Sequence, residues 1–387
     1  MQRSAERILT THTGSLPRPP ELVSLLFAKE EGRQPDPAAL ASAIRDAVTW
    51  VVAQQAEAGV DVLNDGEMGK ISYATYVKDR LSGFEGEGRM IGMGDILDFP
   101  EFGQRVFKDI DEAVKHMTMP ACNGPIGVKD PDQVQRDIRN VRAATEGIVA
   151  QDVFLSAASP GVIALFLENH YYPSREAYLQ AIAEAMQQEY EAIAQAGLVL
   201  QVDCPDLAMG RHIQFNDASL DEFRRQAQLN VEALNYATRN IDPDQMRMHL
   251  CWGNYEGPHH KDVSLRDIID IVFAARPNAI SLEACNPRHA HEWQVFEDVK
   301  LPDGKLLIPG VIDSTNNYIE HPELVAQRLT NYARLVGQEN VMAGSDCGFG
   351  TAAGMATVDP KITWAKFAAM SEGARLATQA LKVPAHA

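Results

Sequence analysis

Eight short segments of β-branched or apolar residues alternate along the chain with longer segments of helical periodicity. Stretches such as 37–59 and 174–197 repeat apolar residues every three or four positions, and each ends in glycine just before the next short segment. The eight predicted strands are Ile8–Thr11, Asp61–Asn64, Asp152–Ser156, Leu198–Asp203, Arg247–Cys251, Ala279–Glu283, Leu306–Ile312 and Val341–Ser345. This alternation predicts an α/β fold, a (β/α)8 TIM barrel, with residues 1–387 as one domain.

One part of the chain departs from the alternation. Two glycine-rich and polar stretches, GFEGEGRMIGMGD and ACNGPIGVKDPDQ, precede the third predicted strand. We interpret residues 73–149 as an insertion between strands 2 and 3, lying over the mouth of the barrel. A doubly wound open sheet is the competing architecture, but no Gly-x-Gly-x-x-Gly motif follows the first strand.

The charge of the chain argues against two classes of partner. The formal net charge is −18, and the acidic residues are spread along the chain, so neither nucleic acid nor an anionic membrane surface is an expected partner. No apolar run is long enough to span a bilayer, and the N-terminus lacks the pattern of a secretory signal, so we expect a cytoplasmic protein. The five widely spaced cysteines then indicate metal ligation or buried thiols rather than disulfides.

Reactive side chains follow several predicted strands, whose C-terminal ends share one face in a barrel. His249 and Cys251 are two residues apart, so both point to the same side of a strand. Glu283 follows a buried strand, and Cys347 ends the last strand in a glycine-flanked turn. Cys285 would face the same way as Glu283 and is a rival ligand on geometry. Taken alone, a His-x-Cys pair is more often part of a packed core.

A histidine, two cysteines and a displaceable fourth ligand form a donor set that zinc accepts. Zinc would convert a substrate thiol, with a pKa of about 8.5, into a bound thiolate nucleophile. We therefore predict zinc-dependent transfer of a methyl or alkyl group to a small-molecule thiol, with no catalytic residue beyond the metal site. The alternative of another class is a structural zinc in a non-catalytic or hydrolytic barrel, which ligands scattered over three strand ends disfavour.

Polar residues at other strand ends form a candidate binding shell. The turn at Gly14 and Ser15 can offer backbone N–H groups to an anionic substrate end, and Arg18 can add charge-assisted contacts. The acids are suited to holding an ammonium group, with a helix N-cap or a rim ion pair as their alternative role. The predicted substrate-binding residues are His12, Ser15, Arg18, Glu67 and Asp203.

Together these segments resemble the cobalamin-independent methionine synthase family, specifically its C-terminal catalytic barrel, over nearly the whole chain. The zinc ligands of that family are a His-x-Cys pair, a Glu ending the next strand and a Cys in an Asp-Cys-Gly turn. These match His249, Cys251, Glu283 and Cys347 here. The resemblance, and not the spacing, selects Glu283 over Cys285.

Further matches concern the substrate. The family's threonine-rich first strand ending in Gly-Ser matches TTHTGSLPRP, and its Gly-Glu and Gln-(Val/Ile)-Asp-x-Pro motifs match 66–67 and 201–205. By that resemblance, Glu67 and Asp203 would bind the amino group of homocysteine, and the turn at Ser15 would bind its carboxylate. The implied activity is like that of 5-methyltetrahydropteroyltriglutamate-homocysteine methyltransferase, in methionine synthesis.

The chain also departs from the family. Full-length members carry a second, N-terminal barrel, for which 387 residues leave no room. Phe166 stands near the family's folate-stacking tryptophan, Thr315 replaces a histidine that is a candidate general acid, and Cys204 replaces a glutamate. Short relatives include methionine synthases that take methyl from a corrinoid carrier, and epoxyalkane:coenzyme M transferase, which adds a thiol to an epoxide. Folate, corrinoid and epoxide donors are therefore the alternatives.

Overall fold

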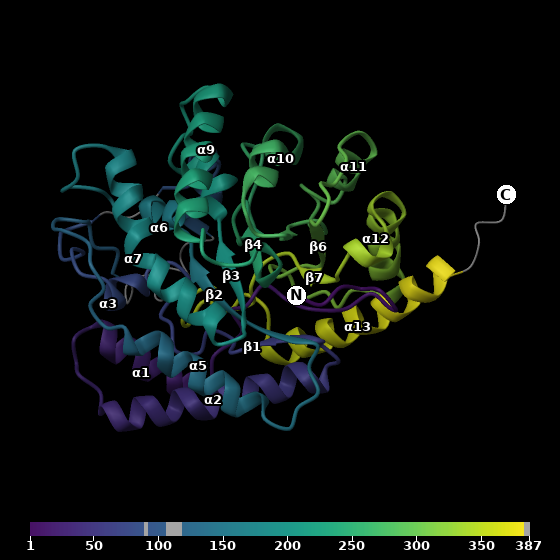
Figure 1. Cartoon of the computed structure of the whole chain (residues 1–387), viewed down its shortest axis with the longest axis horizontal. Coiled ribbons are helices and arrows are strands. Elements are labelled where there is room, and N and C mark those ends of the chain that lie inside the picture. The colour runs from purple at the N-terminus through teal and green to yellow at the C-terminus, as the bar shows by residue number, and fades with distance from the viewer. Residues whose placement is uncertain (89–91, 106–117, 383–387) are drawn as a thin grey trace.

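The computed structural model describes residues 1–88, 92–105 and 118–382, and the seven strands in this part of the chain form one parallel sheet in chain order (Figure 1). Each strand pairs in parallel with the next, so that Asp203 lies beside His249 and His249 beside Ser281. The strands are β1 (Val62–Asn64), β2 (Asp152–Ala158), β3 (Val199–Asp203), β4 (Met246–Leu250), β5 (Ala279–Leu282), β6 (Leu306–Ile312) and β7 (Gly344–Ser345).

The predicted first strand, Ile8–Thr11, is an extended segment with a single bridge, between Thr10 and Ala343, and not a regular strand. Its backbone is nevertheless bonded on both sides. The Val62 N–H donates to the Thr10 carbonyl at 3.0 Å, and the Ala343 N–H donates to the Leu9 carbonyl at 2.8 Å. The segment therefore fills the gap between β7 and β1 and closes the ring, which is the place predicted for the remaining strand.

Among the other strands, β7 differs most from its prediction, Val341–Ser345. The β6–β7 register shifts between Gly310 and Ile312. Asp346 packs against Gly310 so closely that a Cβ there would overlap it. The irregular register shortens the regular pairing and leaves the residues after β7 free to form a turn.

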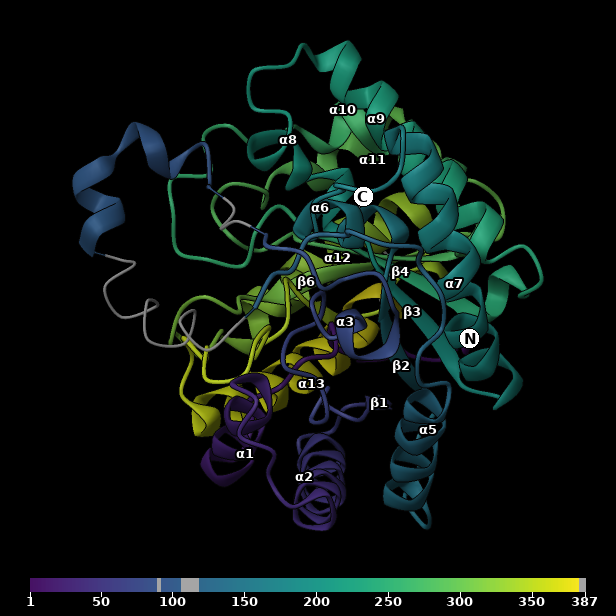
Figure 2. The ribbon, with the colours of Figure 1, turned by 90° about the vertical axis from the view of Figure 1, so that its left-hand side faces the viewer.

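Helices surround the ring of strands (Figures 1 and 2). In Figure 1, α2 lies beside α1 and α5, and α13, in yellow, runs along α12. None of the described helices combines the length and the apolar character needed to cross a bilayer. The helices are α1 (Pro20–Glu30), α2 (Pro37–Glu57), α3 (Val77–Arg80), α5 (Asp132–Thr145), α6 (Pro160–Phe166), α7 (Arg175–Gln195), α8 (Gly210–Ile213), α9 (Leu220–Ala237), α10 (Leu265–Ala274), α11 (Val295–Asp298), α12 (Pro322–Val336) and α13 (Pro360–Lys382).

The inside of the ring changes from apolar to polar along the strands. The guanidinium of Arg247 lies 4.2 Å from the centroid of the Phe154 ring and donates to Thr11 Oγ1 at 2.9 Å. The next residues on the same side of the chain are His249 and Cys251, because side chains alternate along β4. The apolar cluster below this level consists of Leu9, Val62, Phe154, Val199, Ala279, Leu306, Ile308 and Met342.

Residues 65–151 connect β1 to β2, where the insertion was predicted, and contain α3, the 3-10 helix η1 (Ile96–Asp98) and α5. Asp95, just before η1, accepts hydrogen bonds from Tyr255 Oη at 2.6 Å and from the His259 N–H at 3.0 Å. This part of the insertion thus docks on the loop that follows Cys251. Residues 89–91 and 106–117 of the predicted insertion lie outside the described residues, and the single-domain assignment stays a prediction.

The packing of α13 on α12 can be tested at Gly373, where a Cβ would overlap the side chain of Val325. We expect Gly373→Ala to lower the free energy of unfolding by about 1 to 3 kcal/mol, because the added methyl group overpacks this contact. Gly210→Ala is the control, since a Cβ at this helical glycine meets its nearest neighbour, Phe223, at 3.8 Å. Equal urea unfolding midpoints for the two variants would contradict the expected difference.

Candidate metal centre

His249 and Cys251 project from β4 and its C-terminal end into the polar end of the ring. His249 is buried, and its Nδ1 lies 3.3 Å from Ser281 Oγ on β5. Burial, together with the charge of Arg247, lowers the pKa of His249 to about 3. The imidazole is therefore neutral, which is the form that ligates metals.

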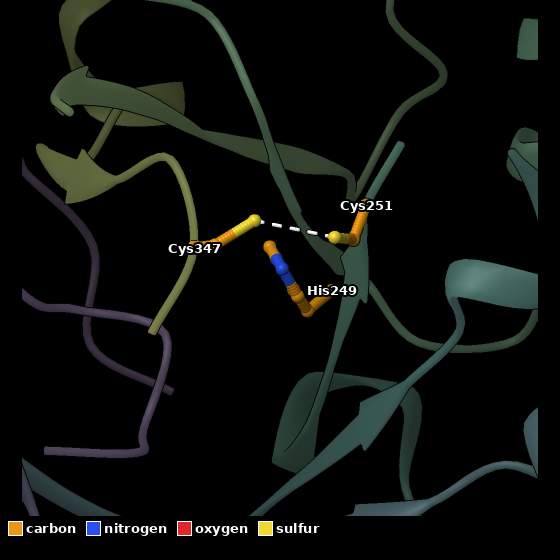
Figure 3. Close-up of side chains that lie close together, drawn as sticks. All are labelled: His249, Cys251 and Cys347. Atoms are coloured by element: carbon orange, nitrogen blue, oxygen red, sulfur yellow. Dashed lines mark hydrogen bonds between the residues drawn. The ribbon is translucent and has the colours of Figure 1, made fainter. Parts of the chain in front are cut away.

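Cys347 reaches the same point from the turn after β7. Its Sγ lies 3.2 Å from Cys251 Sγ, and Figure 3 shows both sulfurs and the His249 ring pointing toward one another. One ligand atom from each of these three buried residues lies within 4.8 Å of the other two. Gly348 permits the turn, because a Cβ there would overlap Ser15 Oγ. The structure thus brings together three of the four predicted ligands, in an arrangement consistent with a metal site.

Glu283 lies at the edge of this cluster. Its Oε1 is 3.4 Å from Cys347 Sγ, yet the same oxygen accepts the Trp252 N–H at 2.7 Å. The Asn286 side-chain amide donates to Oε2 at 2.8 Å. The carboxylate is therefore held beside the cluster by two donors of the protein, while the group of three ligand atoms does not include it.

Cys285, the rival of Glu283 on spacing, does not join the cluster. All five cysteines are free and buried, but the metal-binding group contains only Cys251 and Cys347. Burial, then the charge of Asp346, raises the pKa of the Cys285 thiol well above its usual range. Cys285 is thus a buried neutral thiol, whereas Cys251 and Cys347 face each other.

Asp346, which sequence reasoning did not single out, fixes the loop that follows Glu283. Its Oδ1 accepts the N–H groups of Ala284 at 2.8 Å and Cys285 at 3.0 Å, and its Oδ2 accepts the Asn286 N–H at 2.9 Å. Because it directly precedes Cys347, it couples two of the ligand-bearing turns. The Asp-Cys-Gly sequence was the available signal, but the partners of the aspartate are sixty residues away.

Two buried carboxylates, those of Glu67 and Asp203, lie near the cluster, since Asp203 pairs with His249 across the sheet. Ser156 Oγ donates to Glu67 Oε1, while Glu67 Oε2 is buried without a hydrogen-bond partner among the described residues. Gln201 Nε2 donates to Asp203 Oδ1 at 2.8 Å. Burial, then the charge of Glu67, raises the pKa of Asp203 well above its usual range. A cationic ligand here would supply a donor to Glu67 Oε2 and offset the repulsion between the two carboxylates.

Ser15 and Arg18 are placed differently from each other. The Phe349 N–H donates to the Ser15 carbonyl at 2.8 Å, so Ser15 lies against the turn that carries Cys347. Arg18 donates through Nη1 to the Gly350 carbonyl at 2.6 Å and through Nη2 to the Glu67 carbonyl at 2.9 Å. The two terminal nitrogens of Arg18 therefore bind the protein backbone, whereas its Nε has no hydrogen-bond partner among the described residues.

His12 is packed outside the pocket. Its Nε2 lies 2.9 Å from Gln55 Oε1 on α2, and the Gly14 N–H donates to its Nδ1 at 3.1 Å. The ring lies between Phe154 and Phe367, and burial lowers its pKa to about 3. Both ring nitrogens of His12 are occupied, and the Gly14 N–H, which was expected to face the substrate, donates to His12 instead.

Three comparisons with known proteins bear on this site. A model of the family described as the cobalamin-independent synthase catalytic domain matches residues 165–371. The methionine synthase of Thermococcus kodakarensis is 24% identical over 373 residues, which cover 96% of this chain and 94% of that protein. The methionine synthase of Saccharolobus solfataricus is 24% identical over 376 residues, which cover 96% of each.

Among solved structures, a B12-independent methionine synthase from Shewanella sp. W3-18-1 in complex with selenomethionine has a TM-score of 0.72 and 20% identity. The match covers 97% of this chain and 99% of that one. The predicted α/β barrel fold is thereby confirmed.

The cluster can be tested by metal analysis. We expect Cys251→Ser and Cys347→Ser to reduce the bound metal from about one ion per chain to nearly none, because a site of this kind depends on its thiolates. Cys285→Ser is the matched control, since it removes a buried thiol of the same region without touching the cluster. Retention of the metal by both cluster variants would contradict the assignment.

Proposed function

The chain belongs to the cobalamin-independent synthase family, and we propose that it transfers a methyl group to the sulfur of homocysteine, with zinc as its metal. The observation that carries this proposal is the placement of a His, Cys, Cys cluster and two buried carboxylates, Glu67 and Asp203, at the same end of the barrel. The metal would bind the sulfur of the substrate, and the pocket its ammonium group. Relatives named methionine synthase support this assignment along almost the whole chain.

The residues present fit zinc. The Cys251 and Cys347 sulfurs are 3.2 Å apart and, together with a His249 nitrogen, form a donor set that would hold a zinc ion. Burial raises the pKa of the Cys347 thiol well above its usual range, so a cation is needed to stabilise the thiolate. When bound, zinc would also lower the pKa of the substrate thiol and make it a nucleophile at neutral pH.

Glu283 is the proposed fourth ligand, and the one that the substrate sulfur replaces. It is the oxygen ligand among two sulfurs and a nitrogen, and it already accepts hydrogen bonds from the Trp252 N–H and the Asn286 amide. These donors would hold the carboxylate in place after it leaves the metal. The exchange would therefore cost little rearrangement of the protein.

The buried charges favour homocysteine over coenzyme M. A sulfonate in this pocket would face the unpartnered Oε2 of Glu67 and the carboxylate of Asp203, whereas an ammonium group would satisfy both. Two of the residues predicted to bind an anionic group are engaged within the protein, since the terminal nitrogens of Arg18 donate to two carbonyls and burial lowers the pKa of His12 to about 3. An amino-acid thiol is thus the substrate class that these groups accommodate.

In the proposed reaction the thiolate sulfur attacks the methyl carbon of the donor. The S–C bond forms as the bond from the methyl group to the donor breaks, and the electron pair leaves with the donor. The protein residues orient the thiol through its amino group while the sulfur is held at the metal. The family resemblance implies a methylated folate or a methylated corrinoid as donor.

Zinc X-ray absorption tests whether the thiol binds the metal. We expect two sulfur ligands in the zinc-loaded protein and three after addition of homocysteine, because the substrate sulfur replaces an oxygen of Glu283. If none of the thiols added changes the spectrum, a structural metal would be favoured.

A thiol and donor screen tests the reaction itself. We expect methionine from homocysteine with methyltetrahydrofolate or methylcobalamin, and at least about 10-fold lower turnover with coenzyme M, because its sulfonate meets buried carboxylates. Glu67→Gln should lower the ratio of turnover with homocysteine to turnover with coenzyme M. Turnover of coenzyme M with an epoxide, and none of homocysteine, would replace this proposal by the epoxide alternative.

A further inference from the structure

Lys70 is a buried cation beside the carboxylate pocket. Its side chain is 5% exposed, and Nζ lies 4.4 Å from the centroid of the Tyr76 ring. Among the described residues, no carboxylate oxygen lies within 4.0 Å of Nζ, so its charge is not consumed by a direct ion pair. A buried lysine without an ion pair is costly, and it requires compensation by nearby negative groups.

The hydrogen bonds of Lys70 lead to Ser156. Nζ donates to the Ser156 carbonyl at 2.6 Å and lies 3.4 Å from Ser156 Oγ. The Ser156 hydroxyl in turn donates to Glu67 Oε1. Because a lone pair of the hydroxyl faces the ammonium group, its hydrogen is directed to the glutamate. Lys70 therefore acts on Glu67 through Ser156.

This chain of contacts leaves one glutamate oxygen free. Oε1 of Glu67 is occupied by Ser156, whereas Oε2 is buried without a partner. The backbone is fixed as well, since the Lys70 N–H donates to the Glu67 carbonyl at 3.0 Å and Glu67 itself has a φ of +57°. Oε2 is thus held ready for a donor that comes from outside the protein.

The surroundings of Lys70 keep it in place. The guanidinium of Arg80 lies over the Tyr76 ring, 4.6 Å from the ring centroid. The Tyr76 hydroxyl donates to Glu189 Oε1 at 2.6 Å. Arg80 also pairs with Glu189 at 3.0 Å. The lysine is therefore braced by a buried network that ends at the pocket and does not include any of the metal-binding side chains.

We propose that Lys70 is the positioning residue of the ammonium pocket: it orients Ser156 so that Glu67 keeps one free oxygen, and its charge offsets the repulsion between Glu67 and Asp203. This inference rests on the proposed function, because it assumes a thiol that carries an ammonium group. It makes Lys70 a determinant of which thiols bind, acting independently of the metal.

The test compares two thiols that differ in the amino group alone. Binding of homocysteine and of 4-mercaptobutyrate to the zinc-loaded full chain is measured by calorimetry, with no methyl donor present. Lys70→Met should weaken homocysteine binding by about 10- to 100-fold, because hydrogen bonds to charged groups contribute on this scale. Binding of 4-mercaptobutyrate and the zinc content should stay unchanged, and Lys70→Arg should recover most of the homocysteine affinity.

Lys305→Met is the matched control. Lys305 is also buried and also donates to backbone carbonyls, those of Ala275 at 2.5 Å and Pro277 at 2.8 Å, but it lies just before β6, at the opposite end of the strands. We expect it to leave both affinities unchanged. If Lys70→Met does not fold, Ser156→Ala removes the same link with a smaller change and should produce the same selective loss.

Two outcomes would overturn the inference alone: homocysteine affinity that is unchanged in Lys70→Met and Ser156→Ala, or equal weakening of both thiols. A wild-type protein that takes up zinc but does not bind homocysteine would overturn the proposed function and the inference together. The two failures are therefore distinguished by the wild-type measurement.

Discussion

Closure of the strand ring by the N-terminal segment is the constraint on which the site depends. Leu9 and Thr10 accept backbone hydrogen bonds from Ala343 beyond β6 and from Val62 of β1, so the first and last parts of the sheet are joined through residues that form no regular strand. A closed ring directs the C-terminal end of every strand to one face. In an open sheet, Cys347 would follow the edge strand β7 and lie three strands away from His249 on the central strand β4.

Polar groups buried at this face are satisfied unevenly, and the pattern indicates function. Asp346 has donors on both oxygens and fixes the loop after Glu283. Glu67 has a donor on one oxygen only. A buried acceptor without a donor costs free energy in the absence of a ligand, so its presence in a folded protein is best explained by a ligand that supplies the donor. In the proposed function, the free oxygen of Glu67 and the nearby carboxylate of Asp203 favour a cationic group on the substrate.

The site has two halves with different electrostatic requirements. The thiol cluster needs a cation to stabilise its thiolates, since burial alone favours neutral cysteines. The two carboxylates would be complemented by an ammonium group, in addition to the nearby charges of Lys70 and Arg247. A substrate with a thiol at one end and an amino group at the other meets both requirements. This is the physical reason for proposing homocysteine as the substrate.

The sequence by itself determined the alternation of strands and helices, the position of the insertion and the cysteines and histidine of the cluster, because periodicity and strand-end spacing are local properties. It could not choose between Glu283 and Cys285, which have equivalent spacing, except by family resemblance. It also assigned Arg18 and His12 to the substrate. In the structure, the terminal nitrogens of Arg18 donate to the carbonyls of Gly350 and Glu67. Nε2 of His12 lies within hydrogen-bond distance of Gln55 Oε1. Only the tertiary structure decided these partners and the role of Lys70, because a hydrogen bond between residues 40 to 330 positions apart depends on distances that the local pattern does not encode.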